Sequence, residues 1–123
     1  MIDGRDRVLL NKKLADQSAA YLAMWKALES FDQKADRWAE PISFGSREER
    51  AQAAHNAIAR FRERHLDAVD KEMERDIQTF EVFLQELSSG ASYDAAVDQF
   101  CWRLRDRGSA LADQSVTVAR TAP

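Results

Sequence analysis

Apolar or small residues recur every three or four positions along most of the chain, which is the spacing of an amphipathic α-helix. In the first segment the recurring positions are Leu10, Leu14, Ser18, Tyr21, Trp25, Leu28, Phe31 and Ala35. Neither glycine nor proline interrupts positions 5–40. The pattern therefore predicts a first helix over about residues 5–38.

A second pattern of the same period follows the break at Pro41 and Gly45. Its positions are Ala51, Ala54, Ile58, Phe61, His65, Val69, Met73, Ile77, Phe80, Leu84 and Leu87. No glycine or proline occurs between 46 and 89, so the pattern predicts one continuous helix over about 47–88. At 1.5 Å per residue this helix is about 60 Å long. Such length is typical of a coiled coil or a long hairpin.

A third, shorter pattern begins after Gly90, which suits the end of the second helix. Its apolar positions are Tyr93, Val97, Phe100 and Leu104, with Leu111 beyond them. The spacing predicts a third helix over about 93–107. Because Gly108 lies inside the pattern, the helix either stops there or continues to about 118.

These elements predict an all-α fold in a single domain over residues 1–123. Four glycines and two prolines are too few for the frequent turns of an all-β fold. The short Pro/Gly connection should fold helices 5–38 and 47–88 into a long antiparallel hairpin. The third helix then packs near the bulky half of the second helix and the start of the first.

Several apolar residues fall outside the main stripes, and one helical partner cannot cover all of them. We therefore expect another chain to cover the rest, most simply a second copy related by a two-fold axis. The implied function is a non-catalytic protein–protein interaction module, such as an adaptor, inhibitor, chaperone or assembly component, acting as a homodimer. The candidate partner-binding residues are Phe80, Phe83, Leu84, Leu87, Trp102, Arg103 and Arg107.

Net charge, cysteine content and targeting sequences narrow the class of partner and the location that we expect. Lys and Arg number 18 against 21 Asp and Glu, a net charge of −3, whereas nucleic-acid binders usually carry a basic surplus. The single cysteine, Cys101, cannot form an intrachain disulfide. No stretch approaches the roughly 20 apolar residues of a membrane span, and the N-terminus lacks a signal-peptide pattern. We expect a soluble cytoplasmic protein that binds protein, not nucleic acid or membrane.

Catalytic chemistry finds little support in the sequence. His55 and His65 are the only histidines, and ten positions apart they do not share a helix face. Neither lies in a Glu-x-x-His or His-Glu-x-x-His pattern. We therefore predict no enzyme, no catalytic residues, no metal site and no cofactor.

Two short patterns nevertheless leave a histidine-dependent alternative open. His55 lies on a helix as in phosphotransfer domains, with Ile58 and Ala59 where that family has a basic residue and glycine. His65 and Arg60 form Arg-x-x-x-x-His, which loosely resembles the RNA-cutting motif of HEPN nucleases, with Phe61 in place of a polar residue. These resemblances imply a small RNA-cutting or phosphotransfer protein using histidine acid–base chemistry.

A second alternative rests on helix length. Trp38-Ala39-Glu40 lies where secreted hairpins of the WXG100 type have Trp-x-Gly, and Tyr93 lies where they have Tyr-x-x-x-Asp/Glu. Here the glycine is replaced by Glu40, and Val97 occupies the acidic position. Residues 5–90 therefore resemble that family in shape, which implies an exported helical hairpin.

Overall fold

The computed structural model describes residues 4–32 and 47–120, and within these ranges it contains helices and no strand. The helices are α1 (Gly4–Glu29), α3 (Arg47–Arg64), the short 3₁₀ helix η1 (Leu66–Ala68), α4 (Lys71–Ser88) and α5 (Ala95–Arg120). The predicted all-α class is confirmed. The predicted break at Pro41 and Gly45 and the last part of the first predicted helix, 33–38, lie outside the described residues.

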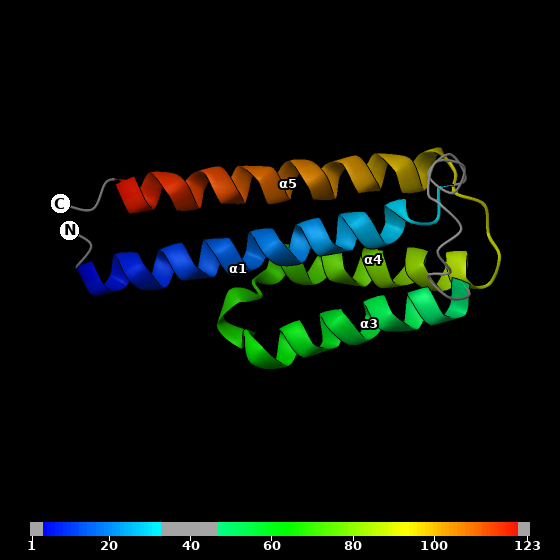
Figure 1. Ribbon diagram of the computed structural model, residues 1–123, viewed down its shortest axis with the longest axis horizontal. Coiled ribbons are helices and arrows are strands. Elements are labelled where there is room, and N and C mark those ends of the chain that lie inside the picture. The colour runs from blue at the N-terminus through cyan, green and yellow to red at the C-terminus, as the bar shows by residue number, and fades with distance from the viewer. Residues whose placement is uncertain (1–3, 33–46, 121–123) are drawn as a thin grey trace.

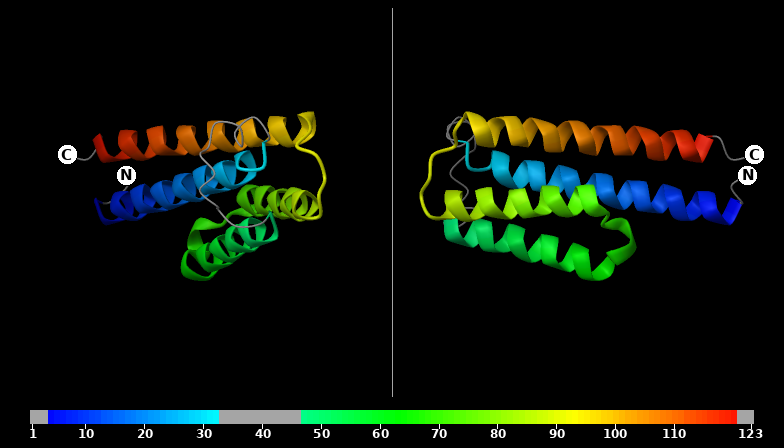
Figure 2. Two further views of the ribbon diagram at one scale, coloured as in Figure 1. Left: turned by 45° about the vertical axis from the view of Figure 1, so that its right-hand side comes forward. Right: turned by 180° about the vertical axis from the view of Figure 1, so that it is seen from behind.

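Two long helices and one shorter hairpin make up the arrangement (Figure 1). Helix α5 runs antiparallel along α1, so the start of α1 and the end of α5 lie together. Helices α3 and α4 form an antiparallel hairpin beside α1; α4 passes behind α1 in Figure 1 and in front of it in the reverse view of Figure 2. The core draws on all four helices, chiefly Tyr21, Met24, Leu28, Ile58, Met73, Ile77, Phe80, Leu104 and Leu111.

One end of the α1/α5 pair extends beyond the hairpin (Figure 1). No described side chain is buried before Leu14 in α1 or after Leu111 in α5. We call residues 5–13 and 112–118 the projecting end. It has two helices where the rest of the molecule has four, so it exposes more of each helix.

Gly108 allows α1 and α5 to approach closely. Its carbonyl oxygen accepts a hydrogen bond of 2.7 Å from the Ser18 hydroxyl. A Cβ at position 108 would lie 2.9 Å from two side-chain atoms of Leu22 and 3.3 Å from Cβ of Tyr21. The glycine therefore serves packing between helices, and α5 continues past it to Arg120, which decides between the two predicted ends.

Changing Gly108 to alanine should destabilise the protein, although alanine favours helices. The overpacking costs about 1–3 kcal/mol, which outweighs the gain of roughly 1 kcal/mol from helix propensity. Chemical denaturation of Gly108→Ala, alone and with Leu22→Ala, measures both contributions. In the Leu22→Ala background the same substitution should become stabilising, and a Gly108→Ala protein more stable than the parent would contradict the packing role.

The second predicted helix, 47–88, is not continuous, and this prediction is corrected by the structure. Helix α3 ends at Arg64 and α4 begins at Lys71, with η1 between them. Two helices of 18 residues therefore replace one long one, and each can pack against the same half of α1. The apolar period continues through the break, which is why periodicity alone does not reveal it.

Side chains stabilise the break between α3 and α4. Asp70 is the N-cap of α4, and its carboxylate accepts the backbone N–H of Met73 at 2.8 Å. Gln17 of α1 is buried and donates to the carbonyl oxygen of Ala68 at 2.7 Å. The unpaired backbone groups of the turn thus find partners, including one from a different helix.

The first predicted helix ends earlier than residue 38. Helix α1 stops at Glu29 and a turn follows, in which the Phe31 N–H bonds to the Leu28 carbonyl oxygen. Arg50 of α3 donates to the carbonyl oxygen of Ser30 at 2.8 Å and lies 4.9 Å from the centre of the buried Phe31 ring. Contacts with α3 therefore stabilise the end of α1.

Candidate protein-interaction surface

Three of the seven candidate partner-binding residues belong to the chain's own core. Phe80, Leu84 and Leu87 of α4 are all buried among the other helices. Phe83 is partly buried, and its ring lies 5.4 Å from that of Phe100 on α5 in a tilted arrangement. The described fold leaves these aromatic and aliphatic groups of α4 little surface to offer a partner.

Two further candidates, Arg103 and Arg107, join α5 to α4. Arg103 lies 3.1 Å from a carboxylate oxygen of Asp76, and Arg107 lies 3.7 Å from Glu72. The other Asp76 oxygen accepts a hydrogen bond of 2.5 Å from the Tyr21 hydroxyl. Asp76 and Tyr21 are buried, whereas Arg103 and Glu72 lie at the surface, so the network connects α1, α4 and α5 from the core to the surface.

Burial and the Asp76 hydrogen bond both keep Tyr21 neutral. Removal from water is the larger cause that raises the pKa of the Tyr21 hydroxyl well above its usual value, followed by the hydrogen bond to Asp76. Burial likewise raises the pKa of the Cys101 thiol, whose sulfur lies 3.5 Å from the Trp25 carbonyl oxygen. A thiol in this state is a poor nucleophile at neutral pH.

Trp102 is the apolar candidate that the fold leaves on the surface. Its side chain is 52% exposed on α5. The Arg105 guanidinium lies 4.9 Å from the Trp102 ring and 5.4 Å from the Trp25 ring of α1. The guanidinium therefore lies near both indole rings, within the range of a cation–π interaction. Arginine and tryptophan are both enriched among the residues that contribute most to binding at protein interfaces.

Exposed and partly exposed apolar or small residues extend from this stack along one side of the α1/α5 pair. On α5, Trp102 is followed at seven-residue intervals by Ser109 and Val116. Seven residues fall only about 20° short of two turns, so each set lies along one side of its helix. On α1 the corresponding row is Val8, Ala15 and Leu22.

Helix geometry places both rows on the side opposite α4. Arg103 and Arg107 mark the side of α5 that faces α4, and at about 100° per residue Trp102 is turned about 100° from Arg103 and about 140° from Arg107 around the helix. In Figure 1, α4 lies behind α1, so the side of α1 away from α4 is turned toward the viewer. We call it the outer face: Trp25, Arg105, Trp102, Ser109 and Val116 with Val8, Ala15 and Leu22. Val8 is 68% exposed and Val116 49%, and no helix of the described chain covers them.

The two histidines contact different acids, His55 from the middle of α3 and His65 from the turn that follows it. His55 lies 3.1 Å from Glu81 of α4, and His65 lies 3.3 Å from Asp16 of α1. Their side chains are part of separate surface pairs. The described residues therefore do not bring the two histidines together into one acid–base site.

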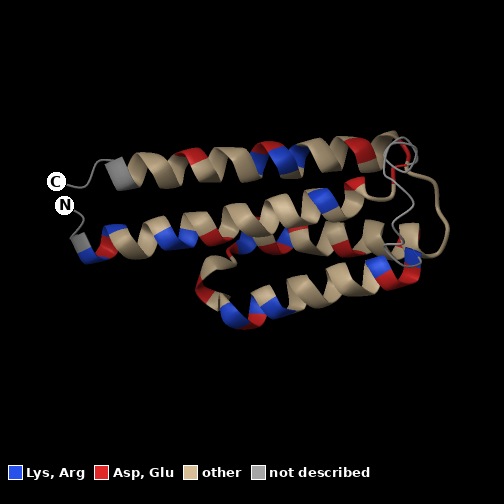
Figure 3. Cartoon of the chain, viewed as in Figure 1, with Lys and Arg blue, Asp and Glu red and all other residues tan. Residues whose placement is uncertain are grey.

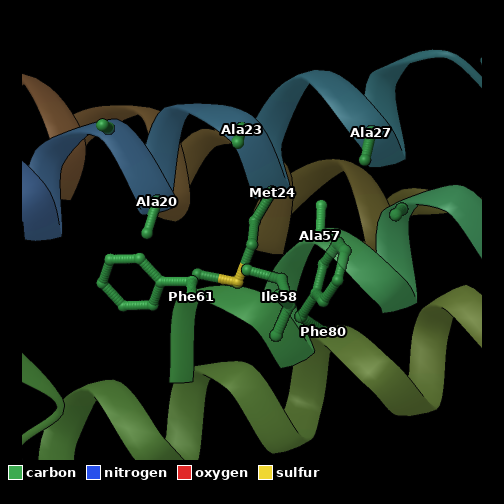
Figure 4. Close-up of a pocket in the computed structure, with 10 residues that line it drawn as sticks. Ala20, Ala23, Met24, Ala27, Ala57, Ile58, Phe61 and Phe80 are labelled. Carbon is green, nitrogen blue, oxygen red and sulfur yellow. The ribbon is translucent and has the colours of Figure 1, made fainter. Parts of the chain in front are cut away.

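An apolar hollow of about 240 Å³ separates α1 from α3 (Figure 4). Six alanines line it, and the side chains of Met24, Ile58, Phe61 and Phe80 reach into the space between the helices. Alanine side chains are too short to close the gap between α1 and α3. No polar side chain lines the hollow, so it has no group for acid–base chemistry.

Searches for metal-ion clusters and membrane-spanning helices cover the described residues only. Among residues 4–32 and 47–120, no group of three or more His, Cys, Asp or Glu residues is placed to hold a metal ion. No helix in these ranges combines the length and apolar character needed to cross a membrane. No protein-family model, curated protein or solved structure gives a significant match to this chain.

Proposed function

We propose that this chain is a non-catalytic protein-interaction module that self-associates through its outer face. A homodimer would pair the α1/α5 faces of two copies about a two-fold axis, so that each copy presents the same patch to the other. Two helices from each copy would then form a four-helix layer at the interface. The same proposal includes a cytoplasmic location, because a lone cysteine fits a reducing compartment.

The stack of exposed Trp102 on Arg105 and the partly buried Trp25 is the observation that carries this proposal. Large aromatic side chains stabilise a fold when buried, yet half of the Trp102 side chain meets solvent. Arginine stacking holds the indole in place before a partner arrives, which lowers the entropy lost on binding. The rows ending at Val8 and Val116 extend the apolar surface from the stack to the projecting end.

Changing Trp102 to serine should weaken the dimer about tenfold or more, because truncation of a central interface tryptophan typically has this effect. The fold should persist, since the side chain contributes to the surface and not to the core. Sedimentation velocity across a concentration series measures the dimer constant, and circular dichroism checks the helical content.

Val82→Ser is the matched control for that experiment. Val82 is 57% exposed but belongs to α4, outside the outer face. Its replacement should leave self-association unchanged. A parent protein that stays monomeric at every concentration would exclude self-association, and equal effects of both substitutions would exclude the outer face as the interface.

A further inference from the structure

A groove separates the projecting end of α1 from the turn that joins α3 to α4. Its volume is about 410 Å³. One wall is the first half of α1, with Leu9, Lys12 and Lys13; the other is the end of α3 with η1, where Arg64 and Leu66 lie. Leu9 and Val8 point to different sides of α1, so the groove is separate from the outer face.

The two most exposed leucines of the described chain both line this groove. Leu66 is 74% exposed and Leu9 is 62% exposed. Leu66 lies in the break between α3 and α4, where it begins the 3₁₀ helix η1. Exposed apolar side chains that converge from distant parts of a chain are typical of a binding surface.

Positive charge flanks these leucines on both walls. Lys12 and Lys13 project from α1 and Arg64 from the end of α3, and the blue segments of Figure 3 mark both places. Within residues 4–32 and 47–120, none of the ion pairs involves these three cations. Of the two acids in the groove, Asp16 already contacts His65 at 3.3 Å. Asp67 is the other, so cations outnumber acids around the leucines.

We propose that this groove binds an acidic amphipathic helix of a partner protein. The apolar stripe of that helix would lie on Leu9 and Leu66, and its flanking carboxylates would face Lys12, Lys13 and Arg64. A concave site with cations on two walls suits a rod better than it suits the flat surface of a bilayer. The inference rests on the proposed interaction function and specifies the chemistry of the partner.

A displayed library of helical peptides tests the proposal without knowledge of the natural partner. The library varies the apolar stripe and, independently, places acidic or basic residues on its flanks. Selection on the immobilised full chain should enrich peptides with an apolar stripe and acidic flanks. Enriched peptides should bind the Leu9→Ser/Leu66→Ser variant about tenfold more weakly or worse, and their binding should weaken as salt is raised.

Three control proteins make the selection specific. Val82→Ser removes an equally exposed apolar residue from another surface and should bind the enriched peptides as the parent does. Lys12→Glu/Lys13→Glu keeps both leucines and should lose the preference for acidic flanks. Trp102→Ser should retain peptide binding, because the outer face is separate from the groove. If the parent chain dimerises but enriches no peptide, only the groove proposal is excluded. If it stays monomeric but enriches peptides, only the dimer proposal is excluded.

Four outcomes would overturn the proposal. Enrichment of basic flanks would contradict the charge argument, and no enrichment over the Leu9→Ser/Leu66→Ser variant would leave the groove without a role. Binding to phosphatidylserine vesicles that is lost in that variant would assign the groove to a membrane surface. Dimerisation lost in that variant but retained in Trp102→Ser would assign it to a second copy of this chain.

Discussion

Replacing Asp76 with alanine is expected to lower the free energy of unfolding by about 3 kcal/mol. The buried carboxylate accepts the Tyr21 hydroxyl at 2.5 Å and contacts Arg103 at 3.1 Å. Without it, the Tyr21 hydroxyl remains buried with no acceptor from α4. The Arg103 side chain is 61% exposed, so that ion pair contributes only a small part of the loss.

Urea denaturation of Asp76→Ala, Tyr21→Phe and the double variant measures how much of the loss in unfolding free energy comes from the interaction between the two side chains. Because the two groups satisfy each other, the double variant should be more stable than the sum of the single losses implies. Asp76→Asn keeps the shape and one acceptor, and should lose less than Asp76→Ala. Additive losses would mean that Tyr21 and Asp76 act independently, contrary to the hydrogen bond.

Changing Phe80 to alanine should have the largest effect of any substitution considered, about 3–5 kcal/mol. The ring is fully buried and reaches the hollow between α1 and α3 (Figure 4). Truncation would enlarge a space that the surrounding alanines already fail to fill. For a domain whose total stability is of the order of 5–15 kcal/mol, this loss approaches unfolding.

Thermal and chemical denaturation of Phe80→Ala test whether Phe80 is core or interface. Val82→Ala, two positions away on the exposed side of α4, should stay within about 0.5 kcal/mol of the parent. A Phe80→Ala protein of normal stability with lost self-association would instead place Phe80 at a partner interface, as the sequence pattern suggested.

Periodicity predicts the helices and most of the core because burial repeats with the helical turn. The stripe from Met73 to Leu87 is the buried face of α4. Periodicity did not predict the break before α4, because the break depends on Gln17, a side chain from another helix. Asp70 is the local signal that was present: an N-cap residue followed by Glu72 and Glu74 in the first turn.

The sequence pattern does not separate core residues from interface residues, for a physical reason. A large apolar residue on a helical stripe gives the same sequence pattern whether the residues that cover it belong to its own chain or to another. Phe80 and Leu84 are covered from within, whereas Trp102 is not. The stack of Trp102 on Arg105 and Trp25 further requires the alignment of α1 against α5, which no local pattern contains.

The pairing of α1 with α5 also bears on how the chain folds during synthesis. Hydrogen bonds between these helices join residues 90 and 104 positions apart in the chain, Ser18 with Gly108 and Asn11 with Ser115. Contacts of such separation slow folding, because the loop must close before they contribute. While α5 is still inside the ribosome, the apolar side of α1 that it covers stays exposed. Helix α5 therefore completes the covering of α1, and a nascent chain that stalls before residue 108 presents an open α1 face to other proteins.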